Sequence, residues 1–133
     1  MKVHHIGYLV KSIENAEKDL EQLGYCRKTQ VVFDPVRNVD ISFWENEGYC
    51  VELVSPKSEA SVAYGLMKTC KNKPYHIGYL TGCIEEEIKR LKEAGYTQID
   101  TPTEAVAIDG KRVCFLMSPD SGMIELVEIC REH

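Results

Sequence analysis

Apolar and polar positions alternate at the start of the chain and then take up a helical period. Residues 3–10 alternate and are rich in β-formers, which predicts a strand. Ser12 follows in a position suited to a helix N-cap, and Ile13, Ala16 and Leu20 lie at the spacing of one helix face. Gly24 predicts the end of this helix, because glycine readily adopts the left-handed conformation that follows a last turn.

Three β-type stretches follow the helix, at residues 26–33, 39–45 and 49–54. Residues 46–48 (NEG) predict a hairpin turn between the last two stretches. The first part of the chain therefore predicts the element order β-α-β-β-β.

The same plan occurs a second time further along the chain. Between residues 5–25 and 76–96, eleven of the twenty-one aligned pairs are identical, which indicates a duplicated module. In the second copy Ile84, Ile88 and Leu91 predict the apolar face of a helix that Gly95 ends. The β-type stretches of this copy lie near 98–99 and at 105–108, 112–117 and 123–129.

These patterns predict an α+β fold in which two tandem βαβββ modules form a curved, barrel-like mixed sheet around a cleft. We expect a single domain over residues 1–133, with module one at 1–57 and module two at 73–133. The connecting segment at 58–72 carries a short predicted helix at 59–67.

Strand parity singles out two polar residues in each module. Successive side chains of a strand point to opposite faces, and we expect the bulkier apolar face to meet the helix. In module one this places His5 and Glu52 on the face away from the helix. In module two it places His76 and Glu125 on the corresponding face. The parity therefore predicts a His/Glu/His/Glu cluster in the cleft.

Two imidazoles and two carboxylates are typical of a catalytic transition-metal site. A glutamate flanked by Val51 and Leu53 would be costly to bury without a partner, and one dication supplies a partner for both carboxylates. This donor set suits Ni(II), Co(II), Zn(II), Fe or Mn better than Ca(II) or Mg(II). Such a site favours proton abstraction next to a carbonyl group that the metal polarises.

Composition narrows the possible partners. The chain has a net charge of −5 and a pI of about 5.4, so it lacks the basic field that nucleic acid binding requires. No apolar stretch approaches the ~20 residues of a membrane span, and no export signal is recognisable. Six cysteines without a C-x-x-C pair are expected to be free thiols. We therefore expect a cytoplasmic protein whose partner is a small molecule.

Four motifs resemble the vicinal oxygen chelate superfamily: HHIG at 4–7, VELVSP at 51–56, YHIGY at 75–79 and FLMSPDSGMIELVE at 115–128. The resemblance covers the whole chain and implies paired βαβββ modules. It also places four metal ligands on His5, Glu52, His76 and Glu125.

Within this superfamily the chain is most similar to glyoxalase I (lactoylglutathione lyase), which isomerises a methylglyoxal–thiol hemithioacetal. The resemblance implies that Glu125 is the catalytic base, that Glu52 assists reprotonation, and that the metal is Ni(II) ahead of Co(II) or Zn(II). The arginine that such glyoxalases carry early in the first strand is absent, and Leu9 and Val10 occupy that region.

Two alternatives remain at this point. Methylmalonyl-CoA epimerase shares the HHIG opening, and in it a carboxylate at the place of Asp40 acts as a base on an acyl thioester. Non-enzymatic drug-binding proteins of the bleomycin-resistance kind use an aromatic cleft, for which Trp44 and Tyr49 are candidates. In each case we expect a homodimer, because sheets of this size leave apolar edges to cover.

Overall fold

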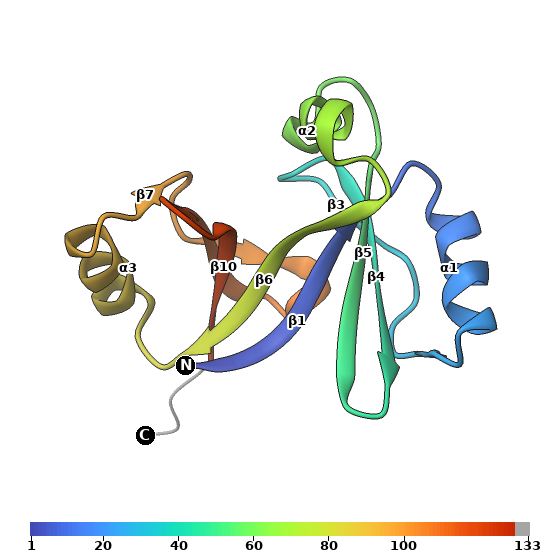
Figure 1. The fold of residues 1–133 in the computed structure, drawn as a ribbon, viewed down its shortest axis with the longest axis horizontal. Coiled ribbons are helices and arrows are strands. Elements are labelled where there is room, and N and C mark those ends of the chain that lie inside the picture. The colour runs from blue at the N-terminus through green and yellow to red at the C-terminus, as the bar shows by residue number, and fades with distance from the viewer. Residues whose placement is uncertain (130–133) are drawn as a thin grey trace. The chain divides into compact units, whose positions relative to one another are not determined.

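The computed structural model describes residues 1–129, which form ten β-strands, three α-helices and one 3-10 helix. This composition confirms the predicted α+β class. The chain divides into two compact units. One contains residues 5–75, and the other contains residues 1–4 with the residues from 76 onward. Figure 1 shows the helices and strands of both units.

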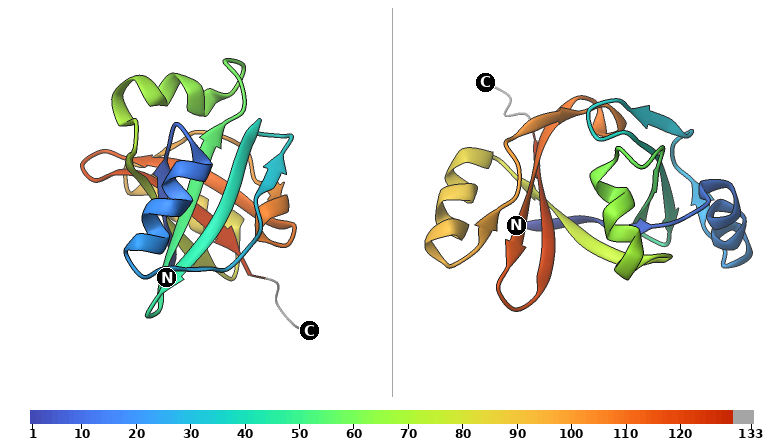
Figure 2. Two further views of the ribbon diagram at one scale, coloured as in Figure 1. Left: turned by 90° about the vertical axis from the view of Figure 1, so that its right-hand side faces the viewer. Right: turned by 90° about the horizontal axis from the view of Figure 1, so that it is seen from above.

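The unit of residues 5–75 contains an open sheet covered by a helix. It contains β1 (Lys2–Leu9) from residue 5 onward, together with β2 (Cys26–Arg27), β3 (Val32–Asp34), β4 (Val39–Asn46) and β5 (Tyr49–Pro56). β1 runs parallel to β5, β5 pairs antiparallel with β4, and both β2 and β3 pair with β4. Helix α1 (Ile13–Gln22) lies on one face of β4 and β5 (Figure 2, left). Helix α2 (Val62–Cys70) follows β5 in the chain.

The second unit repeats this arrangement. Its strands are β6 (Lys73–Thr81), β7 (Thr97–Gln98), β8 (Thr103–Ala105), β9 (Lys111–Ser118) and β10 (Gly122–Glu128). β10 runs parallel to β6 and antiparallel to β9, and β9 also pairs with β7 and β8. Helix α3 (Ile84–Glu93) packs against β9 and β10, as α1 packs against β4 and β5. Over the described residues 1–129, the sheet of neither unit closes into a barrel.

The apolar core of each unit lies between its helix and its sheet. Under α1, the buried residues include Val10, Val51 and Leu53, with Tyr8 partly buried against them. Under α3 the core consists of Ile84, Ile88, Leu91, Cys114, Leu116, Ile124 and Leu126. Val51 and Leu53 flank Glu52, and Ile124 and Leu126 flank Glu125, so the structure agrees with the parity that places these apolar positions on the helix side.

Three predicted elements differ from the structure. The stretch 26–33 is two short strands rather than one, because Lys28 and Thr29 both donate to the Phe43 carbonyl and the chain leaves the regular ladder there. In the stretch 105–108, Ala105 ends β8 and Val106–Ile108 form a 3-10 helix, which a bond from Gly110 N–H to the Ala105 carbonyl follows. The connecting helix begins at Val62 rather than at 59, because Ser61 caps it.

The predicted turns at glycine are confirmed. Gly24 and Gly95 follow α1 and α3 with φ values of 91° and 99°, which lie in the region that favours glycine. In the hairpin between β4 and β5, Glu47 and Gly48 both have positive φ, as a type I′ turn requires. Among residues 1–129 no helix has both the length and the apolar character of a membrane span.

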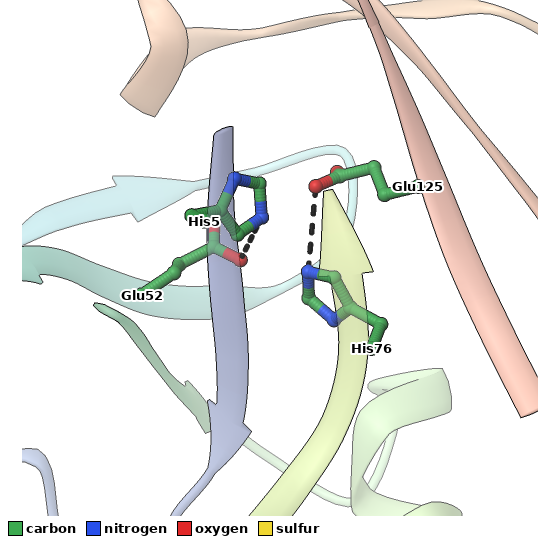
Figure 3. A group of neighbouring side chains, drawn as sticks. All are labelled: His5, Glu52, His76 and Glu125. Carbon is green, nitrogen blue, oxygen red and sulfur yellow. Dashed lines mark ion pairs between the residues drawn. The ribbon is translucent and has the colours of Figure 1, made fainter. Parts of the chain in front are cut away.

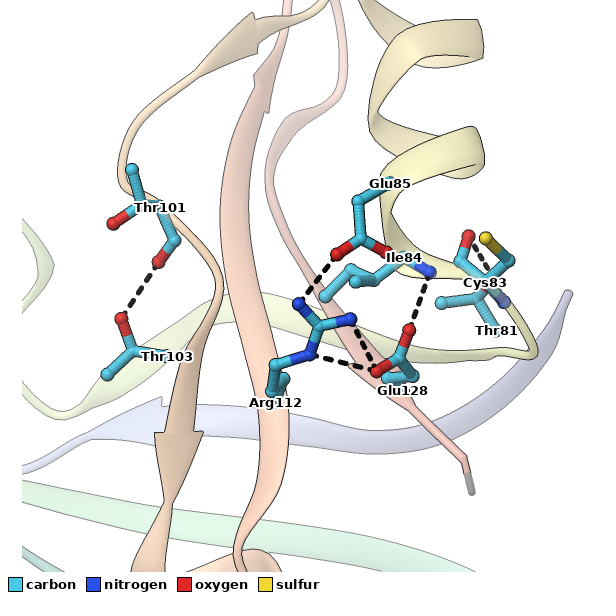
Figure 4. Close-up of polar contacts among 8 residues, drawn as sticks. All are labelled: Thr81, Cys83, Ile84, Glu85, Thr101, Thr103, Arg112 and Glu128. Atoms are coloured by element: carbon cyan, nitrogen blue, oxygen red, sulfur yellow. Dashed lines mark hydrogen bonds and ion pairs between the residues drawn. The ribbon is translucent and has the colours of Figure 1, made fainter. Parts of the chain in front are cut away.

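The two main helices begin with different caps. Ser12 Oγ accepts a hydrogen bond from Asn15 N–H at 3.2 Å, whereas Cys83 makes no side-chain bond to the start of α3. There Glu128 on β10 accepts from Ile84 N–H at 3.0 Å, and Arg112 holds that carboxylate (Figure 4). Arg112 also donates to Glu85, and this bond lowers the pKa of the Glu85 carboxyl.

We predict that Ser12→Ala lowers the free energy of unfolding by about 1 kcal/mol, because one N–H of α1 loses its acceptor. Cys83→Ala is the matched control, since that side chain caps nothing. It should change stability by less than about 0.5 kcal/mol. Urea denaturation of both variants measures the difference, and equal losses would contradict the assignment of the caps.

The five cysteines that the structure describes are free thiols, as predicted; Cys130 lies outside the described residues. Cys26 is exposed, whereas Cys114 is buried, and its burial together with the nearby Asp100 raises the pKa of the thiol to about 12.

Because the thiolate is the reactive form, we predict that iodoacetamide at pH 8 alkylates Cys26 in the folded protein and leaves Cys114 unmodified. Raising the pH to 9.5 should not lead to alkylation of Cys114, because burial and Asp100 raise the pKa of its thiol to about 12. Peptide mass spectrometry measures both sites. Alkylation of Cys114 at the rate of Cys26 would show that the core under α3 opens readily.

Candidate functional site

In the unit of residues 5–75, His5 and Glu52 lie on the sheet face away from α1. Glu52 alternates with Val51 and Leu53, which contact the helix, and Gly7 pairs with Glu52 in the parallel ladder of β1 and β5. His5 is 1% exposed and Glu52 is 3% exposed. The first half of the predicted cluster is therefore buried on the predicted face.

These two side chains contact each other directly. His5 Nε2 lies 3.3 Å from Glu52 Oε1 (Figure 3). The ring of Phe43 on β4 packs against the imidazole, with ring centroids 5.5 Å apart and planes at 88°. Phe43 is also the direct ladder partner of Glu52. One imidazole nitrogen and one carboxylate oxygen are thus held together beside an aromatic ring.

The second unit contains the same arrangement. His76 Nε2 lies 3.4 Å from Glu125 Oε1, and both residues are 3% exposed (Figure 3). Phe115 on β9 packs edge-on against His76, with ring centroids 5.2 Å apart and planes at 89°. Phe115 is the ladder partner of Glu125, as Phe43 is of Glu52. The duplication has therefore preserved a three-residue arrangement.

Each pair is suited to a metal ion. A buried carboxylate is stable only when a positive charge or several hydrogen-bond donors accompany it, and a neutral imidazole leaves the pair with a net negative charge. Each of the four side chains offers one ligand atom, a nitrogen from each histidine and a carboxylate oxygen from each glutamate. These donors fit a borderline divalent transition metal.

The structure does not bring Asp40 to the first pair. Asp40 is opposite Ser55 in the β4–β5 ladder, so it points to the helix side of the sheet, whereas Phe43 and Glu52 point to the other side. Its carboxylate makes an ion pair with Lys57 at 3.2 Å. The prediction that Asp40 is a base beside the metal site is therefore wrong, because its side chain points to the opposite face of the sheet from Glu52.

The two aromatic residues suggested for a drug-binding cleft are also on the helix side. Trp44 is 1% exposed under α1, and Tyr49 is 71% exposed at the β4–β5 hairpin. Neither ring lies on the face of His5 and Glu52. This arrangement weakens the interpretation of the chain as an aromatic drug-binding protein.

A buried polar network accompanies Trp44, and the sequence pattern gave no sign of it. Glu17 on α1 accepts hydrogen bonds from Ser42 Oγ at 2.9 Å and from Trp44 Nε1 at 3.3 Å. Arg27 makes an ion pair with Glu17 at 2.8 Å and stacks over the Trp44 ring. All three partners satisfy one carboxylate, so this network stabilises the packing of α1 on its sheet.

We predict that Glu17→Ala lowers the free energy of unfolding by about 2–3 kcal/mol, because the buried Ser42 hydroxyl loses its acceptor and Arg27 loses its ion-pair partner. Trp44 Nε1 loses one of its two acceptors and keeps Ser42 Oγ. Glu21→Ala on the exposed side of α1 is the control and should cost less than about 0.5 kcal/mol. Thermal or urea unfolding tests this. Similar losses in both variants would show that the network contributes little.

Phe43 and Phe115 are the residues at the site that the sequence reasoning missed. A signal was present, because each phenylalanine stands in the strand before its glutamate, at matching places of the two modules. Comparison of the modules beyond their first twenty-one residues would have found them.

The comparisons with known proteins agree with this architecture. The family model described as the Glyoxalase/Bleomycin resistance protein/Dioxygenase superfamily matches residues 4–115. The chain belongs to this superfamily, and the resemblance to vicinal oxygen chelate proteins is confirmed.

Particular relatives have diverged widely from it. An uncharacterized protein of Bacillus subtilis, YqjC, is 25% identical over 97% of this chain and 91% of its own length. The crystal structure of a hypothetical protein from Bacillus halodurans has a TM-score of 0.85 and 27% identity, covering 99% of this chain and 96% of that one. Methylmalonyl-CoA epimerase from Mycobacterium tuberculosis has a TM-score of 0.81 and 20% identity, covering 96% and 87%.

Proposed function

We propose that His5, Glu52, His76 and Glu125 together bind one divalent metal ion. The observation that carries this proposal is the recurrence of a buried His–Glu pair, at 3.3 Å in one unit and 3.4 Å in the other. Membership of a superfamily that includes metalloenzymes supports it. Four protein ligands would leave two positions of a six-coordinate shell for substrate oxygens.

We propose Ni(II) as the preferred ion, with Co(II) and Zn(II) as alternatives, since imidazole and carboxylate donors suit all three. When bound, the ion supplies Lewis acidity, which polarises a carbonyl oxygen and stabilises the negative charge that develops there. The remaining chemistry, the transfer of a proton at the neighbouring carbon, falls to the carboxylates of the chain.

We propose that the reaction is proton transfer at a carbon next to a carbonyl group, in a substrate that carries a thiol as a thioester or a hemithioacetal. Glu125 removes the proton through a carboxylate oxygen, and Glu52, from the other module, returns a proton. Two carboxylates of matched environment suit this reaction, because each can act as base in one direction and as acid in the other. Their burial excludes water that would compete for the proton.

The first proposed substrate is a 2-branched acyl-CoA thioester, which the enzyme would epimerise. The similarity of the fold to methylmalonyl-CoA epimerase supports this choice. The absence of an early arginine also favours it over a glutathione adduct, because Leu9 and Val10 offer no charge for a glutathione carboxylate. Since Asp40 lies on the other sheet face, Glu52 takes the role of the second acid–base group.

The glyoxalase I reaction, from hemithioacetal to 2-hydroxyacyl thioester (S-lactoylglutathione with glutathione as the thiol), is the second candidate. The complete His/Glu/His/Glu set and the closing motif at 115–128 favour it. Assays of the purified protein with racemic methylmalonyl-CoA, and separately with methylglyoxal and glutathione, distinguish the two by their products. Silence in both assays across a metal panel would favour a binding protein over either enzyme.

We predict that Glu125→Gln lowers the rate of deuterium incorporation from D₂O into the substrate by about 10³-fold, because the amide cannot accept the proton. Asp40→Asn is the matched control and should retain wild-type activity, because that side chain lies on the helix side of the sheet. Wild-type activity in Glu125→Gln would remove this residue from the role of base. Loss of activity in Asp40→Asn alone would restore the epimerase assignment of Asp40.

We also predict that treatment with a chelator gives an inactive apoprotein that Ni(II) or Co(II) reactivates best. Activity of metal-free protein, with its metal content checked by mass spectrometry, measures this. Full turnover without metal would exclude the proposed mechanism.

Homodimer formation and a cytoplasmic location remain predictions, and sedimentation equilibrium tests the first.

A further inference from the structure

Phe43 and Phe115 stand in equivalent positions beside the two histidines. Each ring meets its imidazole nearly at a right angle, with planes at 88° for His5 and 89° for His76. The centroid separations of 5.5 Å and 5.2 Å lie in the range of favourable edge-to-face contacts. Two independent copies thus have the same geometry to within a few tenths of an ångström.

The strand register adds a second contact for each ring. Phe43 is directly opposite Glu52, and Phe115 is directly opposite Glu125. Directly opposed residues of an antiparallel ladder have Cβ atoms about 4.5–5.5 Å apart on the same sheet face. Each phenylalanine therefore borders both the imidazole and the carboxylate of its pair.

Neighbouring positions in the same strands differ between the modules. Ser42 and Trp44 flank Phe43, whereas Cys114 and Leu116 flank Phe115. These flanking residues face the helices, where the apolar core of the first unit includes a buried polar network and that of the second unit contains the thiol of Cys114 and apolar side chains. Only the position that contacts the histidine carries the same residue, phenylalanine, in both modules. This indicates that the phenylalanine serves the His–Glu pair rather than the core under the helix.

The edge-to-face contact matters because rotation of an imidazole about its Cβ–Cγ bond is otherwise only weakly restricted. A ligand ring that turns freely must lose that freedom when it binds a metal, and groups that fix its orientation typically change metal affinity by 10–100-fold. Packing of an aromatic face or edge at a right angle leaves the imidazole only a narrow range of orientations. In that range Nε2 of each histidine points to its glutamate.

We propose that Phe43 and Phe115 are positioning residues, which hold the two imidazoles in the orientation that binds the metal ion. The inference rests on the proposed metal site and adds to it two residues that are not ligands. A phenyl ring offers no ligand atom for a metal ion, so both residues act through the histidines that they contact.

The chain offers a natural control for this proposal. Its three phenylalanines are Phe33, Phe43 and Phe115, and Phe33 is 45% exposed on β3, near Lys57 rather than a histidine. Phe→Leu at each position removes the ring and keeps most of the apolar volume. Phe115 is only partly buried, and Phe115→Tyr keeps an aromatic ring at that position.

The test is titration of the metal-free protein with Co(II) against a competing chelator, together with the visible spectrum of the Co(II) form. We expect Phe43→Leu and Phe115→Leu each to weaken Co(II) binding by about 10-fold and to change the spectrum. Phe115→Tyr should restore affinity to within about threefold of wild type, and Phe33→Leu should have no effect. Unfolding of each apoprotein measures stability separately.

Three results would overturn the proposal. Unchanged Co(II) affinity and spectrum in both leucine variants would contradict it while leaving the metal site intact, even if the variants unfold more easily. An equal loss of affinity in Phe33→Leu would show a general effect of losing a ring. Failure of the wild-type protein to bind Co(II) would refute the metal site itself, and the positioning role with it.

Discussion

The contact between a buried imidazole and a buried carboxylate is the interaction on which the rest of the site depends. Burial makes a carboxylate costly unless a charge or donor accompanies it, and strand alternation decides which neighbours are available. In both units the helix takes one side of the sheet and the His–Glu pair takes the other. A residue of the wrong parity, such as Asp40, cannot join the pair however close it lies in sequence.

The two modules show which features this constraint has fixed. On the helix side they have diverged: Glu17, with partners Ser42, Trp44 and Arg27, stands where the second module has the apolar Ile88. On the other side histidine, glutamate and phenylalanine are the same in both. Core packing tolerates a change from polar to apolar when every buried group is satisfied, whereas a ligand set does not tolerate a change of donor.

Much of the fold followed from the sequence because its signals are local. The alternation of apolar and polar residues predicted the long strands, and apolar residues with a period of 3.6 predicted α1 and α3. Gly24 and Gly95 predicted where these two helices end. The same parity argument identified His5, Glu52, His76 and Glu125 before any fold was known, and the structure pairs them as His5–Glu52 and His76–Glu125.

The features that the sequence did not predict depend on contacts between distant residues. The break in the stretch 26–33 comes from bonds to the Phe43 carbonyl, and the cap of α3 comes from Glu128, more than forty residues away. The network around Glu17 joins a helix to two strands. In the sequence, Glu17 stands among polar residues and resembles a residue on the exposed face of a helix. The sequence does not predict which substrate binds, because epimerisation and the glyoxalase I reaction both move a proton at a carbon next to a carbonyl group.

The most direct test of the central claim is anomalous diffraction at the nickel absorption edge from crystals grown with Ni(II). The account predicts one anomalous peak per chain, bonded to a nitrogen of His5 and of His76 and to a carboxylate oxygen of Glu52 and of Glu125. A map without such a peak, or a metal ion bound by only one of the two His–Glu pairs, would contradict the proposal of one shared metal site.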